Sequence, residues 1–231
     1  MGSEMCIRDR SRTIAYGFQK GADLLASDVK IDGFSTNLKV CWEGNVVPLW
    51  LDRLFGKGQI YAALSAIAVG TIFNLNLVEI SEGLKNYHSL PGMMRLIDGR
   101  KGSFVLDDSE NASPHSMAEA LLVLRRIKAK GKKIAVLGDI VNINSYVADS
   151  HESIGEWAKG SADLLFTLGT RAKLLAQGAR NVGFDESNIY EFLDREELLG
   201  VLISKIGEGD IILVDGSREM NMAGIVARIK K

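Results

Sequence analysis

The stretch FVLDDSENASPHSM, residues 104–117, decides how this chain folds. Its apolar residues run into Asp107 and Asp108, which predicts a buried strand ending at the two aspartates. Polar residues and Pro114 separate that strand from a new apolar pattern, which predicts a turn and then the start of a long helix. A buried strand followed by a helix is the building unit of a parallel α/β sheet.

The same alternation of strand and helix continues to the end of the chain. We predict strands over 103–107, 133–137, 163–167, 210–214 and, more weakly, 188–191, and helices over 116–129, 146–159, 170–181, 194–206 and 220–230. Ligands of such sheets bind at the carboxyl ends of the strands. The residues expected at those ends are Asp107, Asp108, Gly138, Asp139, Gly169, Asp215, Gly216 and Ser217.

The first part of the chain has a different pattern. Alternating strand-like segments are expected over 13–18, 26–32, 35–42 and 46–51, and helices over 59–73 and 77–87. Pro91 and Gly92 then break the pattern and predict a boundary. We therefore expect an α/β protein in which a β-rich and helical piece, 12–93, precedes a Rossmann-like domain with a mainly parallel sheet, 94–231. Residues 1–11 lack periodicity and are interpreted as a non-native or disordered leader.

Bulk composition excludes several classes of protein. Of 231 residues, 46% are hydrophobic and 25% charged, as in an ordinary globular protein, and the net charge of −1 gives no reason to expect a nucleic-acid partner. Cys6 and Cys41 have neither metal nor redox spacing, which fits a reducing cytoplasm. No apolar run reaches the ~18 residues of a membrane span.

Several segments together resemble the Mur ligase family. Residues 107–117 are similar to its D-D-S-Y-N-A-N-P-x-S-M signature, and 211–218 to I-L-V-K-G-S-R. Weaker matches are 13–18 with the late central domain, 61–70 with N-x-x-N-A-L-A-A, 91–94 with P-G-R-M, 134–139 with the second strand of the C-terminal domain, and His151 with a downstream histidine. The blocks occur in the family's order from Thr13 onward and fit the branch acting on muramyl-tripeptide better than the related folylpolyglutamate synthetases.

The resemblance implies ATP-dependent amide formation in peptidoglycan precursor synthesis, in the cytoplasm. ATP and Mg²⁺ would convert the carboxylate of UDP-N-acetylmuramoyl-tripeptide to an acyl phosphate, which D-Ala-D-Ala then attacks. The phosphate-binding loop G-x-x-x-x-G-K-S/T does not occur in the sequence. We therefore expect the C-terminal half of such a ligase, inactive alone, with the magnesium ligands in the missing part.

The resemblance also assigns roles to individual residues. Nucleotide contacts are expected from Gln59, Asp107, Asp108 and Asn111, and substrate contacts from Ser217 and Arg218. A guanidinium such as that of Arg218 suits a carboxylate through a bidentate pair. No catalytic residue and no metal ligand is assigned.

The sequence departs from the family pattern at several of these positions. Gln59 and Ala62 replace the two asparagines of N-x-x-N-A, and Met93 replaces the arginine of P-G-R. Glu110 replaces the tyrosine of the signature, and Asp215 reverses the charge of the lysine in V-K-G-S-R. These changes favour a second hypothesis, a non-catalytic ligase remnant that binds a nucleotide, a muramyl peptide or a protein partner.

Other interpretations concern single motifs. Asp107 and Asp108 are also compatible with a plain turn before a helix that Ser109, Asn111 or Ser113 caps, and His151 with a packing or surface residue. Paired acids after a first strand also occur in phospho-acceptor receiver domains. That class requires a lysine on the last strand, where this chain has Asp215.

Limited proteolysis tests the domain prediction. A central domain cut before its phosphate-binding loop should expose apolar surface, so residues 12–93 should be poorly soluble or self-associate. We expect protease to leave a resistant core that corresponds to 94–231. Uniform resistance of the whole chain would contradict this expectation.

Overall fold

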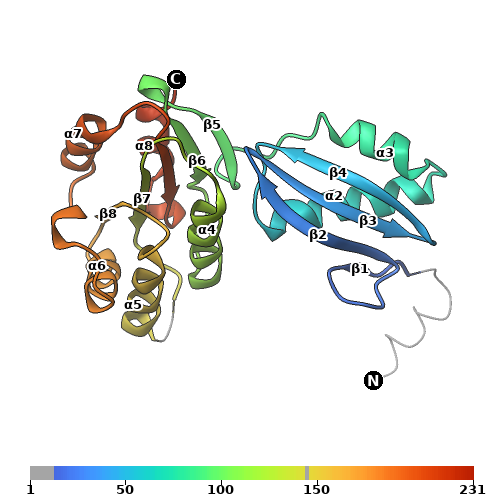
Figure 1. The fold of residues 1–231 in the computed structure, drawn as a ribbon. Helices are drawn as coiled ribbons and strands as arrows, with labels where there is room; N and C mark the ends of the chain where they lie inside the picture. Colours follow the sequence, from blue (N-terminus) through green and yellow to red (C-terminus); the bar gives the residue numbers. More distant parts are fainter. Residues whose placement is uncertain (1–12, 144–145) are drawn as a thin grey trace. The chain divides into compact units, whose positions relative to one another are not determined.

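A computed structural model describes residues 13–143 and 146–231. It contains two compact units (Figure 1). The first comprises the described chain up to Ile31, Ser35–Asp52 and Lys57–Tyr87, and the second comprises Asp32–Phe34, Arg53–Gly56 and His88–Lys231. The predicted leader, 1–11, lies outside the described residues. Among the residues described, no helix is long and apolar enough to cross a membrane.

The first unit is a four-stranded sheet with two helices. Its strands lie in the order β1 (Tyr16–Gly17), β2 (Leu24–Asp32), β3 (Ser35–Trp42) and β4 (Asn45–Asp52), and its helices are α2 (Lys57–Ile72) and α3 (Leu77–Leu84). Strand β3 alternates as predicted, because Thr36, Leu38 and Val40 are buried and their neighbours are not. Helix α2 buries the predicted apolar face, which contains Ile60, Ala63, Leu64, Ile67 and Ala68.

Helix α3 begins at a well-formed cap. The side chain of Asn76 accepts hydrogen bonds from the amides of Val78 and Glu79, and the carboxylate of Glu79 accepts one from the amide of Asn76. Three large apolar residues of this unit, Ile72, Phe73 and Val78, are exposed. Exposed apolar groups of this kind favour association, although the self-association expected above stays a prediction.

The second unit is a six-stranded sheet in the order β5, β6, β10, β7, β8, β9. Its strands are β5 (Arg95–Asp98), β6 (Phe104–Asp108), β7 (Lys133–Gly138), β8 (Leu164–Leu168), β9 (Ile189–Phe192) and β10 (Ile211–Asp215). Strands β6 to β10 run parallel, as predicted, and β5 adds an antiparallel edge that the sequence did not reveal. The predicted α/β class with a mainly parallel sheet is confirmed.

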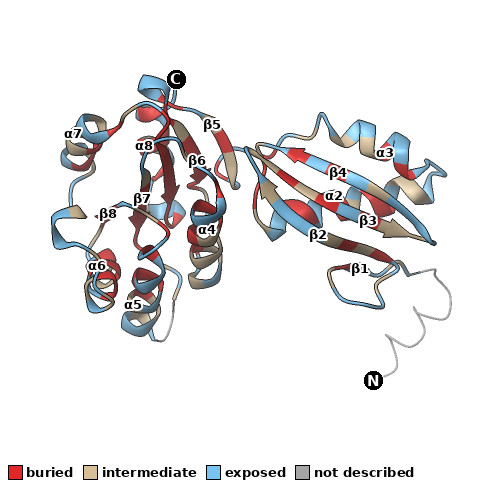
Figure 2. Cartoon of the chain, in the orientation of Figure 1, coloured by how far each residue is buried: buried red, intermediate tan, exposed pale blue. Residues whose placement is uncertain are grey.

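Helices cover both faces of this sheet (Figure 1). They are α4 (Pro114–Arg126), α5 (Val147–Ala158), α6 (Ala172–Asn181), α7 (Arg195–Lys205) and α8 (Ala223–Ile229). Helices α7 and α8 share one apolar core with alternate residues of the strands, among them Val105, Val136 and Val214. Figure 2 shows that the central strands are buried and that the outer helix faces are exposed, whereas the edge strands β5 and β9 are only partly buried. The continuous apolar strands predicted from the sequence are therefore buried on both sides.

Helices α5 and α6 cross closely because each has a glycine at the contact. A Cβ atom added at Gly155 would lie 1.9 Å from the carbonyl oxygen of Leu175, and one added at Gly178 would lie 1.9 Å from that of Glu152. Real Cβ atoms essentially never come this near another atom, so any larger residue would push the helices apart.

We predict that Gly178→Ala destabilises the second unit by about 1–3 kcal/mol, because the obstacle is backbone that cannot rotate away. The matched control is Gly200→Ala within α7, where a Cβ would meet nothing within 4 Å. There the better helix propensity of alanine should stabilise the protein by up to about 1 kcal/mol. Urea unfolding of both variants measures the difference, and equal effects would contradict the packing argument.

Candidate functional site

Acidic side chains gather where the central strands of the second unit end. Strand β6 ends in Asp107 and Asp108, β10 ends in Asp215, and Asp139 follows β7 directly. The register pairs Asp215 with Asp108 on one side and with Leu137 on the other. Because the strands are parallel, these ends share one edge of the sheet, as the sequence predicted.

The side chain of Asp107 is held by hydrogen bonds to neighbouring residues. Its Oδ2 accepts a hydrogen bond from the amide of Gly92 at 2.9 Å, and its Oδ1 accepts one from Ser109 Oγ at 2.6 Å. Gly92 has φ +73°, and a Cβ there would lie 2.7 Å from Cβ of Glu110. The Pro-Gly segment is thus fixed by its own conformation and by Asp107. Arg95 Nε lies 4.0 Å from Asp107 Oδ2.

Asp108 and Asp215 lie next to each other, and few hydrogen bonds compensate for the burial of their carboxyl groups. Asp108 is buried and accepts one hydrogen bond, from the amide of Met94 at 3.1 Å. Burial raises the pKa of Asp108 to about 7; the Met94 bond opposes this rise, and the charge of Asp107 adds to it.

Asp215 is fully buried, and neither of its carboxyl oxygens has a partner that meets hydrogen-bond geometry. Burial raises the pKa of Asp215 well above its usual value, and the charge of Asp108 raises it further. The amide of Gly216 lowers the pKa of Asp215. This effect is smaller than those of burial and of Asp108, because the amide does not have the geometry of a full hydrogen bond.

The loop after β7 is held by three side chains. Ser217 Oγ accepts a hydrogen bond from the amide of Val141 at 2.8 Å, and Arg171 Nη1 donates to the carbonyl oxygen of Val141 at 2.8 Å. His151 is fully buried; its Nε2 accepts from the amide of Ile140 at 3.2 Å, which leaves Nδ1 to donate to the carbonyl of Val147 at 2.7 Å. His151 therefore has the packing role that was one of its two interpretations.

Asp139 anchors the next element of the sheet. Its Oδ1 accepts a hydrogen bond from the amide of Ala172, at the start of α6, at 2.6 Å. Its backbone oxygen accepts from the amide of Ser217 at 3.1 Å. The same residue thus joins the ends of β7 and β10 to the beginning of α6.

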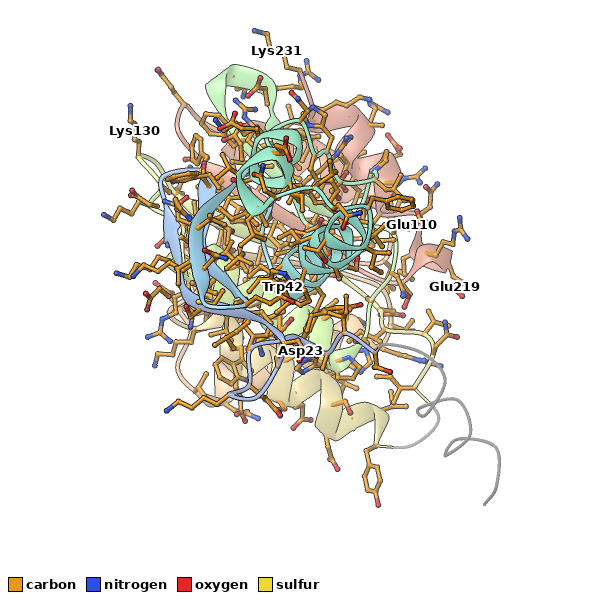
Figure 3. The ribbon with its side chains drawn as sticks, turned by 90° about the vertical axis from the view of Figure 1, so that its right-hand side faces the viewer. Asp23, Trp42, Glu110, Lys130, Glu219 and Lys231 are labelled. Carbon is orange, nitrogen blue, oxygen red and sulfur yellow. The ribbon has the colours of Figure 1, made fainter. Side chains whose placement is uncertain are left out.

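Arg218 lies at the surface of this region. Its side chain is 79% exposed and forms an ion pair with Glu110, with Nη2 2.7 Å from Oε1. Figure 3 shows Glu110 on the same side of the second unit as Glu219, the neighbour of Arg218. The partner of Arg218 is thus the residue that replaces the tyrosine of the family signature.

The structure brings four predicted site residues to one edge: Asp107, Asp108, Ser217 and Arg218. Asn111, three residues after Asp108, is exposed. The helix that follows it, α4, is capped by Ser113, whose Oγ accepts a hydrogen bond from the amide of Ser116 at 3.1 Å. Ser113 was one of the three caps considered.

Gln59 belongs to the first unit. There its Oε1 accepts a hydrogen bond from Tyr87 Oη at 2.6 Å, and burial raises the pKa of that phenol. Gln59 thus lies in a different unit of the chain from the other predicted nucleotide contacts.

Sequence reasoning recorded Asp215 as a departure from the family pattern but missed its pairing with Asp108. The register of a parallel pair depends on long-range contacts, which a strand's own sequence does not show. The ion pair between Glu110 and Arg218 was missed for the same reason, although both residues were noted separately.

In the part of the chain that the structure describes, the acidic cluster contains neither a metal-binding arrangement nor the cavity found in the second unit. Within the two described stretches, no group of three or more His, Cys, Asp or Glu side chains is arranged to hold a metal ion. A cavity of about 500 Å³ in the second unit is lined by residues 98–104, Lys230 and Lys231. It lies at the amino end of β6, away from the acids, so we give it no part in the site.

We predict that His151→Ala destabilises the second unit by about 1–3 kcal/mol, because the amide of Ile140 and the carbonyl of Val147 lose their hydrogen-bond partner. The space that the imidazole leaves empty adds a further cost. His115→Ala is the matched control, because the His115 side chain is 83% exposed. That change should stay within about 0.5 kcal/mol. Urea unfolding measures both, and a similar small loss in the two variants would contradict the packing role.

Comparison with known proteins identifies the family. The model of the family described as "Mur ligase, glutamate ligase domain" matches residues 94–218, more than half of the chain. The UDP-N-acetylmuramoyl-tripeptide–D-alanyl-D-alanine ligase of Bacillus subtilis (strain 168) is 28% identical over 174 residues, covering 75% of this chain and 38% of that protein. The ligase of the same name from Escherichia coli (strain K12) is 28% identical over 213 residues, covering 91% and 45%.

Solved structures show the same fold. MurF from Acinetobacter baumannii superposes with a TM-score of 0.78 at 23% identity, covering 93% of this chain and 46% of that one. MurF from Thermotoga maritima, in complex with ADP, gives 0.76 at 19% identity, covering 98% and 51%. The chain thus spans about half the length, or less, of the relatives it matches. The resemblance drawn from the sequence motifs is confirmed, and the chain belongs to the Mur ligase family.

Proposed function

We propose that this chain supplies the C-terminal part of an ATP-dependent ligase that joins D-Ala-D-Ala to UDP-N-acetylmuramoyl-tripeptide. The proposal is supported by the agreement between the names of the relatives and the positions of the motif residues. The relatives at 28% identity are ligases of that name, and the motif residues Asp107, Asp108, Ser217 and Arg218 lie at one sheet edge, where α/β folds bind ligands.

Within this proposal the residues have separate tasks. Arg218 is exposed, and its present partner is a surface carboxylate, so it is free to exchange Glu110 for the carboxylate of the peptide or the incoming dipeptide. Asn111 is exposed and available to a nucleotide. Ser217 and Asp107 act indirectly, because their side chains already bind the backbone of the loops that form the edge. Asp108 lies beneath that edge, and Gln59 would contact nucleotide from the first unit.

ATP would supply the γ-phosphate that activates the tripeptide carboxylate, and Mg²⁺ would neutralise its charge. The described residues fit this only in part, since they offer no three-ligand metal group. The magnesium ligands are therefore expected elsewhere in the ligase. The chain by itself should then be inactive.

A second function is favoured by one observation. Asp215, which takes the place of the lysine of V-K-G-S-R, is buried beside another acid without a cation. A site that has lost its cations at Met93 and Asp215 attracts phosphates less strongly. The alternative is thus a non-catalytic relative that retains the fold and binds a nucleotide, a muramyl peptide or a protein.

A chimaera separates the two functions. Residues 94–231 would replace the matching domain of the Bacillus subtilis ligase, and ADP release would be measured with UDP-N-acetylmuramoyl-tripeptide, D-Ala-D-Ala and ATP. The proposed function predicts turnover by the chimaera and none by this chain alone. A folded chimaera that binds ATP without turnover would support the non-catalytic alternative.

In the same chimaera we predict that Arg218→Ala raises KM for a carboxylate substrate roughly 10- to 100-fold, the value of a charge-assisted hydrogen bond. Arg228→Ala is the matched control, because Arg228 is also an exposed arginine with one glutamate partner, Glu196 at 3.3 Å. It should leave the kinetics unchanged. Equal effects of the two variants would remove Arg218 from the site.

A further inference from the structure

The pair formed by Asp108 and Asp215 is placed by the backbone. The two residues are register partners on adjacent parallel strands, so their side chains leave the same face of the sheet. Neighbouring strands lie about 4.8 Å apart, which brings the two carboxyl groups close to one another. Neither residue can move away without breaking the β6–β10 ladder.

The surroundings of the pair are apolar. Leu106 and Leu213, two residues earlier on the same face, are fully buried, and so is Leu137, the other register partner of Asp215. Helix α4 packs against β10, and its buried residues include Met117 and Leu121. A carboxylate in such a place loses its hydration without gaining polar contacts.

Nearby charges do not compensate for this loss. Arg95 on β5 lies 4.0 Å from Asp107, and Arg218 is paired with Glu110. Asp139, after β7, binds the start of α6. On α4, which contacts β10, His115 and Glu119 pair with each other, and on α8, which contacts β6 and β10, Arg228 pairs with Glu196. His151 bonds to Ile140 and Val147. The charge that acts on Asp215 is that of Asp108, a second acid.

We propose that Asp108 and Asp215 hold one proton between them in the folded protein and so form a pH-sensitive element at the end of β6 and β10. A protonated carboxyl group can donate a hydrogen bond to its charged partner, which gives one of the two unpartnered Asp215 oxygens a contact. The acid dyad of aspartic proteases shows that two close carboxyl groups cannot both ionise easily.

The sign of the pH effect follows from proton binding. Folding raises the pKa of both acids, so the folded state binds more protons than the unfolded state. The contribution of the pair to stability is therefore fully present below the unfolded value of 3.8, and it is lost as pH rises through about 7 for Asp108 and beyond for Asp215. This is opposite to the usual salt-bridged aspartate.

Carboxyl ¹³C NMR of the full chain, labelled at aspartate, tests the proposal directly. We expect one aspartate resonance to titrate near neutral pH instead of near about 4. That resonance should vanish in Asp108→Asn, and in the same variant Asp215 should titrate at a lower pH than in the wild type, because the charge of Asp108 that raises its pKa is gone. Titration of every aspartate below about pH 5 would overturn the proposal.

Urea unfolding between about pH 5 and pH 9 gives a second readout. The unfolding midpoint of the wild type should fall across this range, and Asp215→Asn should reduce the fall by at least about half. Glu219→Gln is the matched control, because it removes one acid from the adjoining exposed loop, and it should keep the wild-type slope. An unchanged slope in Asp215→Asn would overturn the proposal.

A bound cation is the competing account of two buried acids. Adding Mg²⁺ or Mn²⁺ at alkaline pH should leave the unfolding midpoint of the wild type unchanged. A metal-dependent rise that Asp215→Asn abolishes would overturn proton sharing in favour of a cation site.

Discussion

The pairing of β10 between β6 and β7 is the constraint on which the second unit depends. This ladder brings the ends of three strands to one edge and sets Asp215 directly beside Asp108. The same pairing keeps the apolar residues of all three strands in the core beneath α7 and α8. A one-residue slip of β10 would turn that apolar set away from its core and separate the two acids. Core packing and site geometry are thus fixed by the same hydrogen bonds.

The loops at that edge are fixed by side-chain bonds to backbone groups. Ser217 and His151 accept from the amides of Val141 and Ile140, and Asp139 accepts from the first turn of α6. Each bond satisfies a backbone group that the loop would otherwise leave without a partner in the interior. Motif residues of the family thus have structural tasks here, whereas Asn111 and Arg218 are exposed.

The departures from the family pattern act on each other. Glu110 stands in place of a tyrosine and forms an ion pair with Arg218, so one substitution supplies a partner for a retained motif residue. Asp215 stands in place of a lysine and its carboxyl oxygens have no hydrogen-bond partner, so burial and the charge of Asp108 beside it raise its pKa. An exposed pair of this kind contributes little stability, whereas a buried pair of acids changes the charge of the site.

The sequence alone determined the fold class, because continuous apolar runs alternating with helical patterns are compatible with few architectures besides a covered parallel sheet. It also determined the family and the apolar face of α2, since both follow from local patterns. Tertiary structure decided the antiparallel edge strand β5 and the pairing of Asp108 with Asp215. These features depend on which strands become neighbours and in what register. Long-range hydrogen bonds and packing set that choice, and no residue's own neighbourhood in the sequence encodes it.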